Sequence, residues 1–222
     1  MDERKWQILL DSLLPLLKAG VAFTVPLTLI SFALGLLLAI VTALARLSSW
    51  RALQAISKFY VWVIRGTPLL VQLFIIFYGL PSVGVTLDPF PAAVIGFTLS
   101  VGAYGSEIVR AAILSIHKGQ WEAAYSIGMT RFQALRRIIL PQASRVAVPP
   151  LANSFISLVK DTSLAATVTY TEMFRTAQQI TSTTYEPLLV YSEAAVIYLL
   201  FSTVLSGLQN YLEKRLDRFS AR

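Results

Sequence analysis

The sequence predicts an all-α integral membrane protein that forms a single domain over residues 1–222, because charged residues are scarce and unevenly distributed. They make up 14% of the chain, against 55% for apolar residues, whereas a soluble domain carries about 25% charged residues. Four long segments contain no charged side chain: residues 19–45, 66–87, 89–106 and 194–212. Since a helix of about 20 apolar residues crosses the hydrocarbon core of a bilayer, these segments predict membrane-spanning helices.

Five transmembrane helices are expected once the apolar flanks are included, at residues 19–45, 56–80, 90–114, 138–160 and 190–212. The fourth is the least regular, because its uncharged stretch covers only residues 146–159 and contains Pro149-Pro150. On length alone it is also compatible with a re-entrant or buried helix. Extension back to Ile138 gives it the length of a crossing helix if Arg145 faces protein or the membrane interface.

The N-terminal residues predict a short interfacial helix that precedes the first span. Its apolar residues recur at helical spacing between Trp6 and Leu17: Trp6, Leu9, Leu10, Leu13 and Leu14. The start Met-Asp-Glu lacks the positive charge of a secretory signal peptide.

The distribution of cations predicts the orientation in the membrane. With five spans, the flanks at 46–58, 110–145 and 213–222 lie on one side and carry thirteen of the 19 Lys and Arg residues. The opposite flanks carry five, and Arg65 lies within a span. Because cytoplasmic loops are enriched in Lys and Arg, we expect the N-terminus outside and the C-terminus in the cytoplasm. The net charge of +7 then reflects topology and contact with lipid, without nucleic acid as a partner.

The longest predicted cytoplasmic segment, residues 117–137, has the pattern of a helical hairpin. Glu122, Ala123 and Ala124 are strong helix formers, and Gly128 is suited to end their helix. Thr130 can cap a second, amphipathic helix. The small residues of the first helix would allow close approach to a partner protein.

The same residues carry a resemblance to a known family. Glu122-Ala123-Ala124, Gly128 and the later Ile138-x-Leu140-Pro141 match the pattern E-A-A-x3-G-x9-I-x-L-P without a gap. This pattern resembles the permease subunits of ATP-binding-cassette importers of the type I fold, in which this loop forms a coupling helix that docks into the ATPase subunit. Three further stretches resemble the polar amino acid branch of that family: Arg65–Gln72, Gly119–Ala124 and Leu158–Leu164.

The resemblance implies an assembly in which this chain is a permease and not an enzyme. The sequence contains no G-x-x-x-x-G-K-[ST] phosphate loop, so ATP and magnesium would be bound by the partner. The expected partners are two ATPase subunits, a second permease subunit that is the same or a different chain, and an extracytoplasmic solute-binding protein. The expected location is the bacterial cytoplasmic (inner) membrane.

Polar side chains within the spans are candidates for the substrate path, because they are costly in lipid and face the bundle interior or water. In the first span Thr24 and Thr28 begin a stripe of small residues that continues through Ser31 and Gly35. In the fourth span Ser154, Ser157 and Asp161 share one face. Such stripes more often pack helices together than contact a ligand.

Arg65 is the strongest single candidate, because a charge within a span needs a partner. We expect Arg65, with the backbone near Thr67, to receive the α-carboxylate of the substrate, since a guanidinium binds a carboxylate with two hydrogen bonds. The alternative is a structural ion pair with Glu107 or Glu193. Gln72 lies seven residues further on, which would place it on the same helix face, although Gly66 and Pro68 between them would weaken the helix there.

Three residues of the fourth span bear on specificity and gating. Ser154 is neutral, at a position where a permease for a cationic substrate would benefit from an acidic residue. Residues 149–161 resemble cystine-type permeases, so L-cystine is the predicted substrate. Lys160-Asp161 would form a self-compensating ion pair at the outer interface, or else a gate or a contact with the binding protein.

An ion-coupled secondary carrier is the alternative function, with Arg65, Glu107 and Glu193 as its coupling charges. Five spans, however, do not divide into two equal inverted repeats, and a carrier leaves the cytoplasmic hairpin unexplained. A membrane enzyme or a metal site is disfavoured, because one histidine, no cysteine and scattered carboxylates offer no convergent catalytic or metal-ligating cluster.

Overall fold

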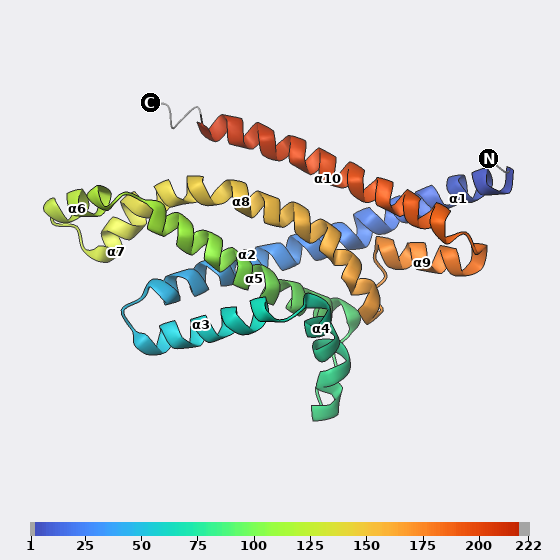
Figure 1. Cartoon of the computed structure of the whole chain (residues 1–222), viewed down its shortest axis with the longest axis horizontal. Helices are drawn as coiled ribbons and strands as arrows, with labels where there is room; N and C mark the ends of the chain where they lie inside the picture. The colour runs from blue at the N-terminus through green and yellow to red at the C-terminus, as the bar shows by residue number, and fades with distance from the viewer. Residues whose placement is uncertain (1–2, 218–222) are drawn as a thin grey trace.

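The computed structural model describes residues 3–217, which form helices and turns with no strand in this range. Figure 1 shows long helices that run roughly side by side, with short helices at both ends of the bundle. The elements are α1 (Glu3–Ala19), η1 (Gly20–Thr24), α2 (Val25–Leu47), α3 (Arg51–Gly66), α4 (Leu69–Phe74), η2 (Ile75–Gly79), η3 (Leu80–Val83), α5 (Pro89–Ser115), α6 (Lys118–Ser126), α7 (Arg131–Ala134), η4 (Leu135–Ile139), α8 (Leu140–Asp161), η5 (Thr162–Val168), α9 (Met173–Thr184) and α10 (Pro187–Asp217).

The N-terminal helix is not separate from the first span, which corrects the prediction of a short interfacial helix. Glu3–Leu47 forms one continuous helix of 45 residues. At 1.5 Å per residue it is about 68 Å long, well beyond the ~30 Å hydrocarbon core. Its first part packs against α9 and α10 through a core that includes Leu16, Met173 and Ala194. This tertiary contact holds α1 in line with α2.

Three π-helical segments each end two residues before a proline. In the first, the N–H of Val25 donates to the carbonyl of Gly20, five residues back, and Pro26 follows. Proline lacks an N–H and its ring crowds the carbonyl four residues before it, so a widened turn reassigns the freed carbonyls while the helix continues. The other two cases are Leu80-Pro81 after η2 and Leu140-Pro141 after η4.

The second expected span, residues 56–80, is not one straight helix. The chain breaks at Gly66–Pro68, and the axis after the break is bent by 104° from that of α3. Thr67 is extended (ψ 146°), as expected for a residue before proline. Gln72 is therefore not on a shared helix face with Arg65, which corrects that part of the prediction.

The number of spans is confirmed only in part. Among residues 3–217, three helices are long and apolar enough to cross a membrane: Glu3–Leu47, Pro89–Ser115 and Pro187–Tyr211. The bent pair Arg51–Gly66 and Leu69–Val83 gives a fourth if it counts as one span. The fifth candidate, α8, is 22 residues long but less apolar, and it continues from α7 without interruption.

Close packing of α2 and α5 forms the centre of the bundle. The two helices run parallel, since Gly35 faces Val101 and Ala39 faces Gly105 further along both helices. A Cβ atom added at Gly35 would lie 2.5 Å from the Cβ of Val101. The small residues at this interface therefore let the two backbones approach closely.

The regions that carry most cations lie together at one end of the molecule. Figure 1 shows the α2–α3 turn, α6, α7 and the C-terminal part of α10 at this end, whereas α9 and the start of α1 lie at the opposite end. Two of the cations used to predict orientation, Arg218 and Arg222, lie outside the described residues. The placement of the others agrees with the grouping of flanks on which that prediction rests.

Candidate functional site

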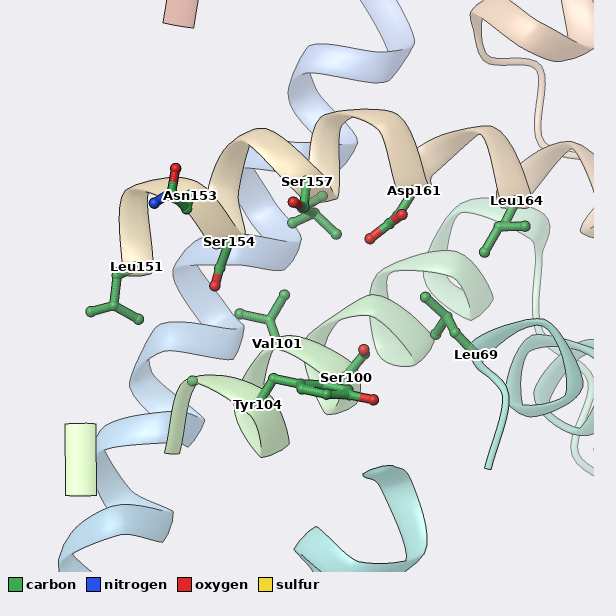
Figure 2. A pocket seen from close by; sticks show the side chains of 12 residues that line it. Leu69, Ser100, Val101, Tyr104, Leu151, Asn153, Ser154, Ser157, Asp161 and Leu164 are labelled. Carbon is green, nitrogen blue, oxygen red and sulfur yellow. The ribbon is translucent and has the colours of Figure 1, made fainter. Parts of the chain in front are cut away.

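A cavity of about 470 Å³, lined by both polar and apolar residues, lies between α5 and α8, beside the break that separates α3 from α4. Figure 2 shows Ser154 and Asp161 extending from α8 toward α5, with Ser100 and Tyr104 on the facing helix. Its volume falls in the range of small-molecule sites, about 300–1,000 Å³. The remaining lining residues are Leu69, Val101, Gly105, Leu151, Asn153, Ser157, Leu158 and Leu164.

Three predicted substrate-path residues line this cavity: Ser154, Ser157 and Asp161. Ser154 Oγ donates a hydrogen bond to the carbonyl of Pro150 at 3.0 Å, so its lone pairs remain able to accept. Asp161 is the only charged residue among those lining the cavity. The site therefore offers one carboxylate and several hydroxyl groups to a polar ligand.

Lys160 and Asp161 do not form the expected ion pair. The ion pairs among the described residues do not include these two side chains. Lys160 lines a different cavity, between α8 and α10, whereas Asp161 faces the cavity between α8 and α5. Successive residues on a helix point in different directions, so adjacency in sequence did not bring the two charges together.

Thr67 and Gln72 lie at the helix break, where they satisfy backbone groups. The Nε2 atom of Gln72 lies 2.8 Å from the carbonyl oxygen of Ile64 and 2.8 Å from Thr67 Oγ1. Thr67 Oγ1 donates to the carbonyl of Val63 at 2.9 Å. Carbonyls freed by a break within the membrane need such donors. Gln72 is buried and supports the shape of the site, next to Leu69 in the cavity wall.

Arg65 forms the ion pair with Glu107 that was the alternative to a ligand contact. Its Nη1 atom lies 3.2 Å from Glu107 Oε1, and its guanidinium lies 5.2 Å from the ring centroid of Tyr104. Arg46 and Arg110 also contact Glu107, at 2.7 and 3.2 Å. One carboxylate thus meets three guanidinium groups, and this cluster adjoins the cavity through Tyr104. The other suggested partner, Glu193, accepts a hydrogen bond from Ser12 instead.

Thr24 and Thr28 are buried outside this cavity. Their exposed fractions are 0% and 1%, and neither is among the residues that line the cavity between α5 and α8. Thr28 Oγ1 donates to the carbonyl of Thr24, whose own Oγ1 accepts from the N–H of Met173. These contacts favour helix packing, and not substrate contact, as the role of the polar stripe that begins at Thr24 and Thr28.

Glu172 is a buried acidic residue that no sequence pattern predicts as part of a site. Its carboxylate accepts hydrogen bonds from the N–H groups of Phe174 and Arg175, at 2.8 and 2.7 Å, and from the hydroxyl of Tyr198 at 2.8 Å. It therefore caps α9 and ties it to α10. Tyr198 lies 26 residues away along the chain, so local sequence contains no signal for this contact.

The α6–α7 hairpin has the predicted local structure. α6 ends in a turn in which Gly128 has φ +78°, and the N–H of Met129 donates to the carbonyl of Ala124 at 3.1 Å. Thr130 and Gln133 form a capping box at the start of α7. Glu122 and Ala123 are exposed, whereas Ala124 is buried within the hairpin. The small size of Ala124 therefore serves internal packing, and Ala123 is the small residue available to a partner.

Comparisons with known proteins agree with this architecture. Residues 35–218 match the family described as binding-protein-dependent transport system inner membrane component. The chain is 56% identical over 218 residues to the L-cystine transport system permease protein TcyB of Bacillus subtilis (strain 168), covering 98% of this chain and 93% of the relative. It is 37% identical to the glutamine transport system permease protein GlnP of Escherichia coli (strain K12), covering 91% and 94% of the two chains.

A solved structure extends the comparison to three dimensions. A chain from the crystal structure of an amino acid ABC transporter with histidines superposes with a TM-score of 0.86 at 36% identity, covering 90% of this chain and 94% of that one. The family match spans more than four fifths of the sequence, and it gives no support to an ion-coupled carrier. The chain therefore belongs to the family of binding-protein-dependent transport system inner membrane components, the permease subunits of ATP-binding-cassette importers.

Proposed function

We propose that this chain moves a polar amino acid, L-cystine, from an extracytoplasmic binding protein into the cytoplasm by alternating access. In this proposal its N-terminus lies outside and its C-terminal end lies in the cytoplasm, as the grouping of cations favours. ATP must then bind the outward-facing assembly better than the inward-facing one, because only differential affinity shifts such an equilibrium.

The cavity between α5 and α8 supports an amino acid as the transported molecule. Asp161 provides a carboxylate for an α-ammonium group, and Ser154 and Ser157 provide hydroxyls for further polar contacts. An amino acid is charged at both ends of its backbone, so it also needs a cation for its carboxylate. The arginine cluster around Glu107 adjoins the cavity and carries an excess of positive charge.

The preference for cystine rests on one observation, the level of identity among relatives. The cystine permease is 56% identical to this chain, whereas the glutamine and nopaline permeases are 37% and 40% identical. The neutral Ser154 in the cavity wall agrees with a substrate that carries no net positive charge.

The proposed assembly contains two ATPase subunits that bind ATP and magnesium, a second permease subunit and the binding protein. The exposed face of α6, including Glu122 and Ala123, is the proposed docking element for the ATPase. Gly128 allows the turn that holds α6 against α7. Movement of the ATPase subunits would reach the spans through this hairpin, because α7 continues without interruption into α8.

Uptake by the purified complex tests this function. Proteoliposomes are loaded with ATP and magnesium, and binding protein is added outside. We expect them to accumulate radiolabelled L-cystine. Excess unlabelled arginine should compete less well than excess unlabelled cystine. Uptake that persists with ionophores present and stops without ATP identifies the importer. Uptake that ionophores abolish and that needs no ATP would establish the carrier, and stronger competition by arginine would overturn cystine.

We further propose that Arg65 and the backbone near Thr67 receive the substrate carboxylate, with Arg65 leaving Glu107 as the substrate arrives. Glu107 keeps Arg46 and Arg110 as partners when this happens. The variant Arg65→Lys keeps the charge but cannot donate two parallel hydrogen bonds to one carboxylate. We therefore expect the KM for cystine to rise about tenfold or more. Arg110→Lys, at the same carboxylate, is the matched control and should leave KM within about twofold. An unchanged KM for Arg65→Lys in a normally assembled complex would show that this assignment is wrong.

A further inference from the structure

A second cavity, of about 610 Å³, lies at the end of the bundle that carries the α6–α7 hairpin. Leu44 comes from the last turns of α2 and Leu114 from the end of α5, while Trp121 and Phe132 come from the hairpin. Leu114 is 58% exposed and Phe132 is 69% exposed, so apolar surface remains uncovered at this end of the described chain.

Two cations line the cavity, Lys118 and Arg131, and its lining contains no acidic residue. Neither cation takes part in an ion pair among the described residues. The Nη2 atom of Arg131 donates to the carbonyl of Leu47 at 3.1 Å, which holds the guanidinium at the end of α2. An arginine has five N–H donors, so this bond leaves others for a bound anion. Ser48 and Ser49 also line the cavity.

The cavity thus combines an apolar wall with a cationic rim, at the point where two apolar helices end. Tryptophan is enriched at the level of lipid headgroups, which agrees with Trp121 in the wall. An occupant that matches both parts has a negative headgroup and a hydrocarbon chain. A free phosphate would satisfy the cations alone and leave the apolar wall uncovered.

We propose that this cavity binds an anionic phospholipid. Lys118 and Arg131 hold its phosphate, and its acyl chains lie along Leu44, Leu114 and Phe132. Basic pockets between helices near the membrane surface suit such headgroups, and each nearby cation strengthens the attraction. The bound lipid contacts both the end of α2 and the hairpin, so it joins two segments that are distant in sequence. The cytoplasmic leaflet as its source rests on the proposed orientation, but the binding does not.

Photolabelling of the assembled complex in nanodiscs tests the site. All discs have the same mixed lipid composition. One set contains a trace of photoreactive phosphatidylglycerol, and the other contains a trace of photoreactive phosphatidylcholine. Chymotryptic peptides locate the adducts, since the cation variants leave aromatic cleavage sites unchanged. We expect phosphatidylglycerol to label peptides from residues 44–49 and 113–135 about tenfold more than phosphatidylcholine does.

Matched variants assign the effect to the two cations. Lys118→Gln with Arg131→Gln should reduce phosphatidylglycerol labelling to the level of phosphatidylcholine. Arg136→Gln with Arg137→Gln removes the same charge from exposed positions of the same segment that do not line the cavity, and should leave labelling unchanged. Lys118→Gln alone keeps the bond from Arg131 to Leu47 and should give an intermediate loss, which tests the site even if the double variant fails to fold.

Three results would overturn the proposal. Equal labelling by the two lipids would mean that the cavity holds no preferred headgroup, and equal loss in the control pair would mean a diffuse charge effect. Labelling of the isolated permease that disappears in the complex would show that the ATPase subunit covers the cavity. None of these results depends on transport, so they are distinct from a failure of cystine uptake.

Discussion

Replacement of Gly35 by valine is expected to destabilise the bundle severely. The new Cβ would lie 2.5 Å from Val101 Cβ and 3.3 Å from the carbonyl oxygen of Thr98, so α2 and α5 must separate. Overpacking of this kind costs about 3 kcal/mol at the upper end of its usual range. For a chain of this size the melting temperature should fall by about 6–12 °C, measured as thermal unfolding of the purified complex in detergent.

Gly207→Val is the matched control, because it places the same side chain on a membrane helix where no atom of the described residues lies within 4 Å of the new Cβ. It should leave the melting temperature within about 2 °C. The pair Gly35→Ala with Val101→Gly removes the isopropyl group that the new methyl group would meet, and should recover part of the stability that Gly35→Ala alone loses. A Gly35→Val complex as stable as wild type would show that α2 and α5 do not approach this closely.

Replacement of Gly128 by aspartate is expected to reduce the stimulation of ATP hydrolysis by loaded binding protein about tenfold or more. Gly128 has φ +78° and lies on an exposed turn. A side chain here costs about 1 kcal/mol or more in backbone strain, and the new charge is added to the hairpin that carries the proposed docking element. The measurement is ATPase activity of the complex in lipid, with and without loaded binding protein, together with the amount of ATPase that copurifies.

Gly84→Asp is the control for this effect, since Gly84 has φ +86° and, within residues 3–217, no atom lies within 4 Å of an added Cβ there either. It follows η3, away from the hairpin in Figure 1. Copurification of the ATPase should therefore be normal in Gly84→Asp and reduced in Gly128→Asp. Normal copurification and full stimulation in Gly128→Asp would refute the coupling role of the hairpin.

Local sequence was a reliable guide where a few neighbouring residues decide the structure. Gly128 ends α6 as predicted, because only a residue without a side chain enters that turn freely. Thr130 caps α7 for an equally local reason. The π-helical segments before Pro26, Pro81 and Pro141 have a local cause too, and the prolines were a signal that could have revealed them.

Predictions that assumed an unbroken helix were less accurate. Arg65 and Gln72 were assigned to one face at a spacing of seven residues, but Pro68 ends the helix between them. The side-chain amide of Gln72 instead donates hydrogen bonds to carbonyls that the break leaves free. Gly66 and Pro68 did predict a weakened helix here, whereas the angle of the break depends on how α4 packs against α5.

By itself, the sequence determined that this protein is helical and membrane-embedded, which end carries most of its cations, and where its helices are capped. Composition and short-range spacing are sufficient for these properties, because they depend on transfer free energies and on hydrogen bonds between near neighbours. Only the tertiary structure decided which polar residues meet. It gathered three arginines on Glu107, buried Thr24 and Thr28, and opened Asp161 to a cavity. Contacts across helices depend on axial register and rotation, which vary with packing over the whole bundle.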